Sequence, residues 1–180
     1  MDADDVIARF GLVPLEAEGG FVNRYWPDAD EHAAAPGSAI LFLVTGAPAG
    51  FSQFHRLTID EIWHRYLGDA AELVLLAPDG ASRHVVLGDD LDRGEQLVHV
   101  VPAGTWMACR TTGRWSLLGT TMAPGFTPDC FEPGDAAELA RQWPHEAAVI
   151  AALTRPAQPA TSPERHVGQG SPMPSRATAR

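Results

Sequence analysis

Residues 51–68, FSQFHRLTIDEIWHRYLG, decide how the rest of this sequence is interpreted. Residues 51–57 and 61–67 are rich in aromatic and aliphatic side chains and are separated by a short polar segment, which predicts two strands joined by a turn. His55 and Glu61 lie on either side of that turn. An imidazole and a carboxylate placed in this way can hold a ligand or transfer a proton.

The segments around this strand pair continue the same pattern. Residues 38–45, SAILFLVT, are a continuous apolar run too short for a buried helix, which predicts a central strand covered on both faces. Glycine and proline corners separate further short strand patterns at 21–26, 72–77, 82–87, 96–101, 106–110 and 115–122. About nine short strands without crossover helices predict an antiparallel sandwich or barrel and exclude a parallel α/β sheet.

Helical patterns occur only near the two ends of the chain, at residues 2–10, 133–143 and 145–153. Residues 154–180 contain five prolines and four arginines but few large apolar side chains. Such a segment buries too little apolar surface to offset its ordering entropy, so we expect a disordered tail there. One domain is therefore expected over residues 1–153, followed by a Pro/Arg-rich tail over 154–180.

Composition excludes several classes of function. The formal net charge of −10 repels phosphate backbones, so no nucleic-acid partner is expected. All 13 basic residues are arginines, which excludes lysine Schiff-base chemistry and a Walker-type phosphate loop. The acidic start is unlike a secretory signal and no apolar run reaches the length of a membrane span, so no membrane partner is expected. Cys109 and Cys130 suggest neither a disulfide framework nor a zinc cluster, and a cytoplasmic location follows.

Five short motifs resemble the type-5 cupin branch of the cupin superfamily, and the match spans roughly residues 5 to 145. They are EGGF at 18–21, FHRLTIDEIWHRYLG at 54–68, VPAGTW at 101–106, LLGTTMAPGF at 117–126 and FEPGD at 131–135. The resemblance implies an all-β fold: a double-stranded β-helix, or jelly roll, of the RmlC kind found in sugar-nucleotide epimerases, with short N-terminal and C-terminal helices. It identifies residues 1–153 as a single cupin domain, in a branch mostly described as a domain of unknown function, and implies a homodimer.

The general cupin pattern implies a divalent metal held by three histidines and one glutamate. His55 and Glu61 match the first histidine and the glutamate, whereas Leu57 and Met107 stand at the other two positions. Two ligands and a soft thioether are a poor set for such a metal. We therefore assign no metal ligand, and the cofactor stays unknown because the ligand set is incomplete.

His55 and Glu61 are the candidate catalytic residues. A carboxylate could hold one imidazole nitrogen and leave the other to act as base or acid. The alternatives are a core histidine satisfied by a backbone carbonyl, and a Glu61 that pairs with Arg56 or Arg65. His64 lies on the opposite parity from Glu61 and is expected to be structural or interfacial.

Six further residues are candidates for ligand binding. Glu18 is followed by two glycines that allow close approach of the backbone, and Gln53 shares strand parity with His55. The others are aromatic, thioether and carboxylate side chains that could form pocket walls or a lid, or else belong to the core or the surface: Trp63, Trp106, Met107 and Glu132.

Three hypotheses on function follow. The first is a small-molecule enzyme that needs no metal, an epimerase or isomerase acting on a sugar-like or other polar metabolite. The second is a non-catalytic cupin that binds a small ligand in the same pocket. The third is a metal-dependent oxygenase or hydrolase, for which the ligand set is incomplete.

Overall fold

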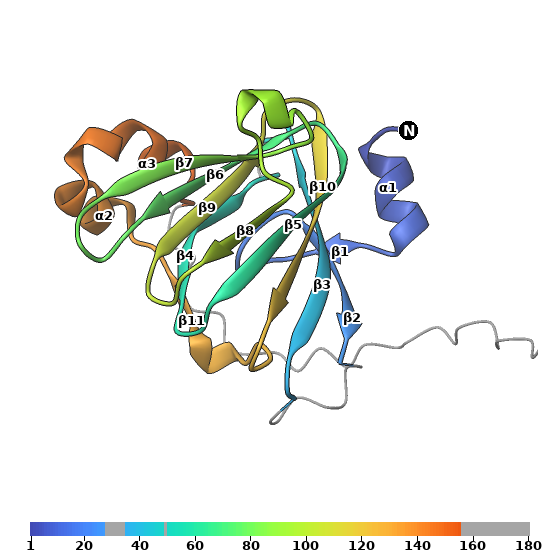
Figure 1. Ribbon diagram of the computed structural model, residues 1–180, viewed down its shortest axis with the longest axis horizontal. Helices are drawn as coiled ribbons and strands as arrows, with labels where there is room; N and C mark the ends of the chain where they lie inside the picture. The colour runs from blue at the N-terminus through green and yellow to red at the C-terminus, as the bar shows by residue number, and fades with distance from the viewer. Residues whose placement is uncertain (28–34, 49, 156–180) are drawn as a thin grey trace, which may run out of the picture.

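Two antiparallel sheets face each other in the computed structural model, which describes residues 1–27, 35–48 and 50–155 (Figure 1). The first sheet has the order β1 (Val13–Pro14), β2 (Phe21–Trp26), β3 (Ser38–Thr45), β10 (Trp115–Met122), β5 (Glu61–Gly68), β8 (Val98–Val101). The second has the order β11 (Phe131–Pro133), β4 (Ser52–Leu57), β9 (Trp106–Thr111), β6 (Ala71–Leu76), β7 (Ser82–Leu87). This arrangement confirms the predicted all-β jelly roll.

Helices cover the outer faces of both sheets. α1 (Ala3–Phe10) packs Val6 against the first sheet, and α2 (Ala136–Gln142) and α3 (Ala147–Ala152) lie on the second (Figure 1). Short 3-10 helices complete the fold: η1 (Leu91–Arg93), η2 (Pro128–Cys130) and η3 (Pro144–Glu146). The N-terminus of α1 is fixed by a capping box, in which the Asp2 side chain accepts a hydrogen bond from the Asp5 backbone and the Asp5 side chain accepts one from Asp2.

β3 is the central strand expected from its apolar run. Phe42 and Val44 belong to the core between the sheets, whereas Leu43 packs on the outer side with the residues beneath α1. Both faces of the strand are therefore covered, which explains why its sequence is continuously apolar rather than alternating.

Two short strands were not expected from the sequence. Neither β1 nor β11 is among the strand patterns found in the sequence. β1 pairs Pro14 with Phe21 at the edge of the first sheet, where a proline removes no donor that the sheet needs. Of the predicted tail, only residues 154 and 155 are described; residues 156–180 lie outside the described part of the chain.

A bulge in β4 sets the orientation of the site residues. Ser52 pairs with Cys109 and His55 with Met107, so three steps along β4 correspond to two along β9. The Phe54 backbone instead donates to the Leu153 carbonyl at 2.9 Å and accepts from the Gly134 amide at 2.7 Å. The extra residue places Ser52 and His55 on the inner face together, while Phe54 packs outward against the helices.

Both cysteines are buried free thiols, as expected for packed side chains. No helix in the described part of the chain is both long enough and apolar enough to cross a membrane.

Replacement of Phe54 by alanine tests the contact between the second sheet and the helices. The side chain is fully buried and packs in a cluster that includes Leu139 and Ile150. Loss of the ring should lower the free energy of unfolding by about 3–5 kcal/mol. Urea denaturation measures the loss, and the exposed Tyr25→Ala serves as a control expected to change stability little. Equal effects of the two substitutions would contradict this account of the packing.

Candidate functional site

A cavity of about 550 Å³ opens at one end of the space between the sheets. Most of its wall is apolar and comes from strands of both sheets and from the loops near them, including Leu15, Val22, Ile40, Phe126 and Phe131. Four ionisable side chains also line it: Glu18, Arg24, His55 and Glu61. A mostly apolar cavity with a few convergent polar groups is the usual form of a small-molecule site.

His55 extends from the inner face of β4 and is 1% exposed. Its Nδ1 lies 2.8 Å from the Gln53 carbonyl oxygen, which can only accept, so Nδ1 carries a proton. Nε2 of the neutral ring is therefore a proton acceptor, and it lies 4.0 Å from Oε1 of Glu18. The ring also stacks on Phe131 with a centroid distance of 5.2 Å. His55 is thus held in one tautomer with its basic nitrogen available to the cavity.

Glu61 begins β5 and is 6% exposed. Trp63 donates its indole N–H to Oε2 of Glu61 at 2.9 Å. Burial raises the pKa of Glu61 from 4.5 to about 7; the nearby Glu18 charge adds to this shift, and His55 and the hydrogen bonds from Thr120 and Trp63 oppose it. The carboxyl group can therefore give or take a proton near neutral pH.

Glu18 comes from the loop between β1 and β2. Its carboxylate accepts a hydrogen bond from the Ser52 hydroxyl at 2.6 Å, and its backbone carbonyl accepts one from the Gln53 amide at 2.8 Å. The loop returns through Gly20, where φ is 64° and a Cβ would lie 2.7 Å from the Leu43 carbonyl oxygen. A side chain at position 20 would clash there, so glycine permits the turn that brings Glu18 to the cavity.

The structure brings three of the predicted site residues together and places five elsewhere. Glu18, His55 and Glu61 line one cavity. Gln53 does not line it, because the bulge in β4 turns its side chain to the loop, where it donates to the Ala17 carbonyl at 2.6 Å. Trp63 is 1% exposed and belongs to the core, where it supports Glu61 instead of stacking on a ligand.

The other three predicted ligand-binding residues also lie outside the cavity wall. Trp106 faces the helices, and the Arg56 guanidinium lies over its ring, 4.6 Å from the centroid. Glu132 is exposed and pairs with Arg56 at 2.7 Å. Met107 is buried in the core opposite His55 in the strand register. Trp106 and the Arg56–Glu132 pair lie on the outer face of the second sheet, away from the cavity. Met107 is too deeply buried to reach the cavity wall.

The role expected of Glu61 is corrected by the contacts. It was expected to orient the imidazole, but the Gln53 carbonyl holds Nδ1 of His55 instead, and Glu61 bonds to Trp63. Neither alternative partner pairs with it, since Arg56 binds Glu132 and Arg65 lies 3.5 Å from Asp89. His55 therefore has the backbone contact of a core histidine and also faces a cavity.

Sequence reasoning missed Ser52. Strict strand alternation predicts that Ser52 and His55 lie on opposite faces of β4. No glycine or proline at the bulge indicates that this alternation is interrupted. Its hydroxyl nevertheless fixes the Glu18 carboxylate.

His64 was expected to point away from the site; it lies outside the cavity, with Nε2 2.9 Å from the Thr121 hydroxyl and its ring stacked on Tyr66.

The donor set does not fit the metal site of the general cupin pattern. The positions of its other two histidines hold Leu57, an apolar part of the cavity wall, and Met107, which is buried behind it. Across residues 1–27, 35–48 and 50–155, no group of three or more histidine, cysteine, aspartate or glutamate side chains is arranged to hold a metal ion. No chemical step is assigned to a metal here.

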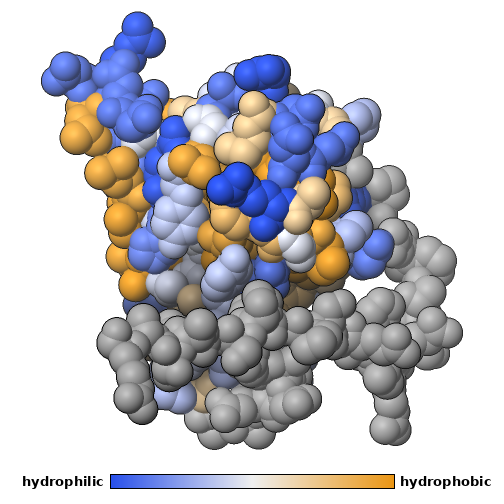
Figure 2. Space-filling view, turned by 90° about the vertical axis from the view of Figure 1, so that its right-hand side faces the viewer, coloured by the Kyte–Doolittle hydropathy of each residue, from blue (hydrophilic) through white to orange (hydrophobic). Residues whose placement is uncertain are grey.

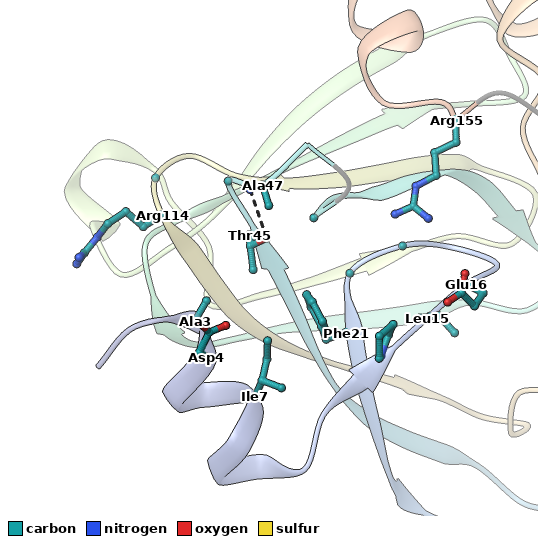
Figure 3. A pocket seen from close by; sticks show the side chains of 16 residues that line it. Ala3, Asp4, Ile7, Leu15, Glu16, Phe21, Thr45, Ala47, Arg114 and Arg155 are labelled. Carbon is teal, nitrogen blue, oxygen red and sulfur yellow. Dashed lines mark hydrogen bonds between the residues drawn. The ribbon is translucent and has the colours of Figure 1, made fainter. Parts of the chain in front are cut away.

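A second hollow, of about 710 Å³, lies between α1, the β1–β2 loop and the turn after β3 (Figure 3). Arg155 extends into it above Leu15 and Phe21, whereas Arg114 points away from it (Figure 3). Leu15 lines both hollows. The second hollow is lined by carboxylates and arginines but by no histidine, whereas the first holds His55 together with two glutamates, so the first is the candidate active site.

The raised pKa of Glu61 has a consequence for stability. Between pH 4.5 and about 7 the unfolded chain releases this proton and the folded chain retains it, so rising pH lowers stability by up to about 3 kcal/mol through this group. Glu61→Gln abolishes this contribution. The stability of the variant relative to the unsubstituted protein should therefore increase across that pH range, measured by urea unfolding. Glu138→Gln on α2 is the control, and parallel pH profiles for Glu61→Gln and the unsubstituted protein would contradict the assignment.

Comparison with known proteins agrees with the fold. A profile of the family described as Cupin superfamily (DUF985) matches residues 4–133. A protein of known structure from Shewanella oneidensis is 34% identical, with a TM-score of 0.77 over 87% of this chain and 99% of that chain. A hypothetical protein from Leishmania major is 28% identical, with a TM-score of 0.75 over 86% of this chain and 99% of that chain.

A more distant likeness concerns the fold alone. Oxalate decarboxylase from Bacillus subtilis is 13% identical, with a TM-score of 0.52 over 82% of this chain and 40% of that chain. A search of curated proteins finds no significant match. The two facing antiparallel sheets, the profile that covers most of the described domain and the similarity to complete solved chains lead to one conclusion: this chain belongs to the cupin superfamily, in the family DUF985.

Proposed function

We propose that this protein is an enzyme that moves protons on a small molecule, as an isomerase or epimerase does. The observation that carries the proposal is the placement of a buried base and a buried acid in one cavity, on facing sheets. Nε2 of His55 is a free acceptor, and Glu61 has its pKa raised to about 7. Groups that titrate near working pH are the most effective general acids and bases.

The geometry supports a division of roles. Nε2 of His55 takes a proton from a substrate carbon next to a carbonyl, and the electron pair moves to the carbonyl oxygen. Glu61, in its protonated form, donates a proton to that oxygen. Glu18, 4.0 Å from Nε2, stabilises the imidazolium that forms. Return of a proton from solvent to the opposite face of the same carbon gives an epimer. Where that carbon carries a hydroxyl group, loss of the hydroxyl proton and return of a proton to the former carbonyl carbon gives an isomer.

The cavity wall favours a substrate with a substantial apolar part. Phe126 and Phe131 supply its phenyl rings, and the two tryptophans that were candidates for ligand binding lie elsewhere. A bulky sugar nucleotide has many polar groups that this wall leaves without partners. We therefore favour a small carbonyl compound over a sugar nucleotide.

Deuterium exchange tests the proposal. The protein is incubated in D₂O with aldose and ketose phosphates, sugar nucleotides and 2-oxo acids, and carbon-bound deuterium is measured by mass spectrometry. His55→Gln should slow exchange by about 100-fold or more, because a general base contributes that much. Exchange should also fall as pH rises through about 7, where Glu61 loses its proton.

His64→Gln is the matched control, since this histidine lies on β5, the strand that carries Glu61, but outside the cavity. It should leave exchange unchanged. Absence of exchange with every compound, or full exchange by His55→Gln, would contradict proton transfer at this site. Saturable binding without exchange would favour the second candidate, a non-catalytic binding protein, which the predominantly apolar wall also supports.

We also propose that two copies of the chain associate through the outer face of β5 and β8. β8 ends its sheet, so one of its edges is open for pairing. Val98 and Val100 are about half exposed, at 50% and 49%, and Leu67 and Tyr66 on β5 are also exposed. Figure 2 shows a column of apolar side chains along its left margin, the side that faces the viewer in Figure 1.

Charge introduced on this face should prevent association. We expect the unsubstituted protein to be a dimer in light scattering and the Val98→Lys/Val100→Lys variant to be a monomer, because buried ammonium groups are costly at an interface. Tyr25→Lys on β2, also an exposed position, is the control and should remain dimeric. A monomeric unsubstituted protein would refute the proposal.

A further inference from the structure

Arg24 lies on the inner face of the first sheet at the cavity. It has the same parity along β2 as Val22, which packs against the core, and it pairs with Ile40 on β3. Val22, Arg24 and Ile40 all line the cavity. Arg24 is exposed, whereas His55 and Glu61 are buried, so the guanidinium belongs to the mouth of the cavity and the acid–base pair to its interior.

No carboxylate in the described part of the chain forms an ion pair with Arg24. The arginines that are paired contact other groups: Arg56 binds Glu132, Arg65 lies near Asp89 and Arg110 binds Glu72. Glu18 and Glu61, the carboxylates of the cavity, are bonded to Ser52 and Trp63 instead. Among residues 1–27, 35–48 and 50–155, the arginine at the mouth is therefore left without a carboxylate partner.

We propose that Arg24 anchors an anionic group, a carboxylate or a phosphate, on a substrate whose apolar body extends inward to His55. The proposal rests on the proton-transfer function and names the class of its substrate. A guanidinium binds either anion through two parallel hydrogen bonds, which fixes orientation as well as position. Val22, Ile40 and Phe126 supply apolar surface along the same wall.

Electrostatics gives the arginine a further role. The chain has a net charge of −10 and the cavity contains two glutamates, so an anionic ligand meets unfavourable potential without a local cation. Arg24 provides that cation at the mouth, away from the reacting centre. An anion bound there leaves Glu61 free to stay protonated, because the new negative charge is paired with the guanidinium.

Matched ligands separate charge from shape in a direct test. The probes are 4-phenylbutyrate, 2-phenylethyl phosphate and the neutral 4-phenylbutanamide, with affinities measured by calorimetry. At least one anion should bind the unsubstituted protein about tenfold or more tighter than the amide. Arg24→Gln should remove that difference because it weakens binding of the anion, while the affinity of the variant for the amide stays the same. Which anion binds distinguishes a carboxylate substrate from a phosphate one.

Two further variants complete the test. Arg24→Lys should retain part of the preference for the anion, since it keeps the charge but not the paired donors. Arg141→Gln, an exposed arginine on α2, should bind all three probes as the unsubstituted protein does. Equal affinity for the amide and both anions, failure of both anions to bind, or unchanged anion binding by Arg24→Gln would overturn the proposal.

The outcome is separable from that of the proton-transfer proposal. His55→Gln should bind the anionic probe normally even though it should lose deuterium exchange. If exchange fails while Arg24 still selects anions, the chain is a binding protein for organic anions. If exchange occurs on neutral compounds and Arg24→Gln has no effect, the proton-transfer function is supported and the proposal of an anionic substrate is refuted.

Discussion

The backbone of Phe54 is the point on which the site depends. Its amide and carbonyl leave the ladder between β4 and β9 and bond to Leu153 and Gly134, which belong to the segments around the C-terminal helices. Without these partners the bulge would bury two unsatisfied backbone groups, at a cost comparable to that of lost hydrogen bonds. The helices therefore do more than cover a sheet, because they permit the change of face that puts Ser52 and His55 side by side.

Much of the fold could be predicted from local pattern. β3, β4 and β5 were expected within a residue or two of where they lie, because burial on one or two faces produces a recognisable apolar pattern in the sequence. The sequence did not show that β4 and β5, which are joined by a turn, belong to different sheets. β11 has no recognisable apolar pattern, since it is three residues long and two of its residues are exposed. Its pairing with β4 depends on where the chain returns, which local composition does not encode.

The site was less accessible to the same reasoning. His55 and Glu61 were identified because an imidazole and a carboxylate flank a turn, and Glu18 because two glycines follow it. Gln53, Trp63, Trp106, Met107 and Glu132 were placed at the cavity by strand parity or by residue type. Parity fails at a bulge, as Gln53 shows, and residue type does not separate a cavity wall from the core, as Trp63 shows. The hydrogen bond that selects the tautomer runs from Nδ1–H of His55 to the backbone carbonyl of Gln53, and a backbone acceptor cannot be identified from residue type.

The contact between Trp63 and Glu61 gives the molecule an optical property. An indole whose N–H is bonded to a carboxyl group senses whether that group is charged, and Trp63 is almost fully shielded from water. Its emission is therefore coupled to the protonation of Glu61 and to any ligand that disturbs the carboxyl group. With the other four tryptophans replaced by phenylalanine, the protein would carry its own fluorescent reporter in the core, bonded to a residue that lines the cavity.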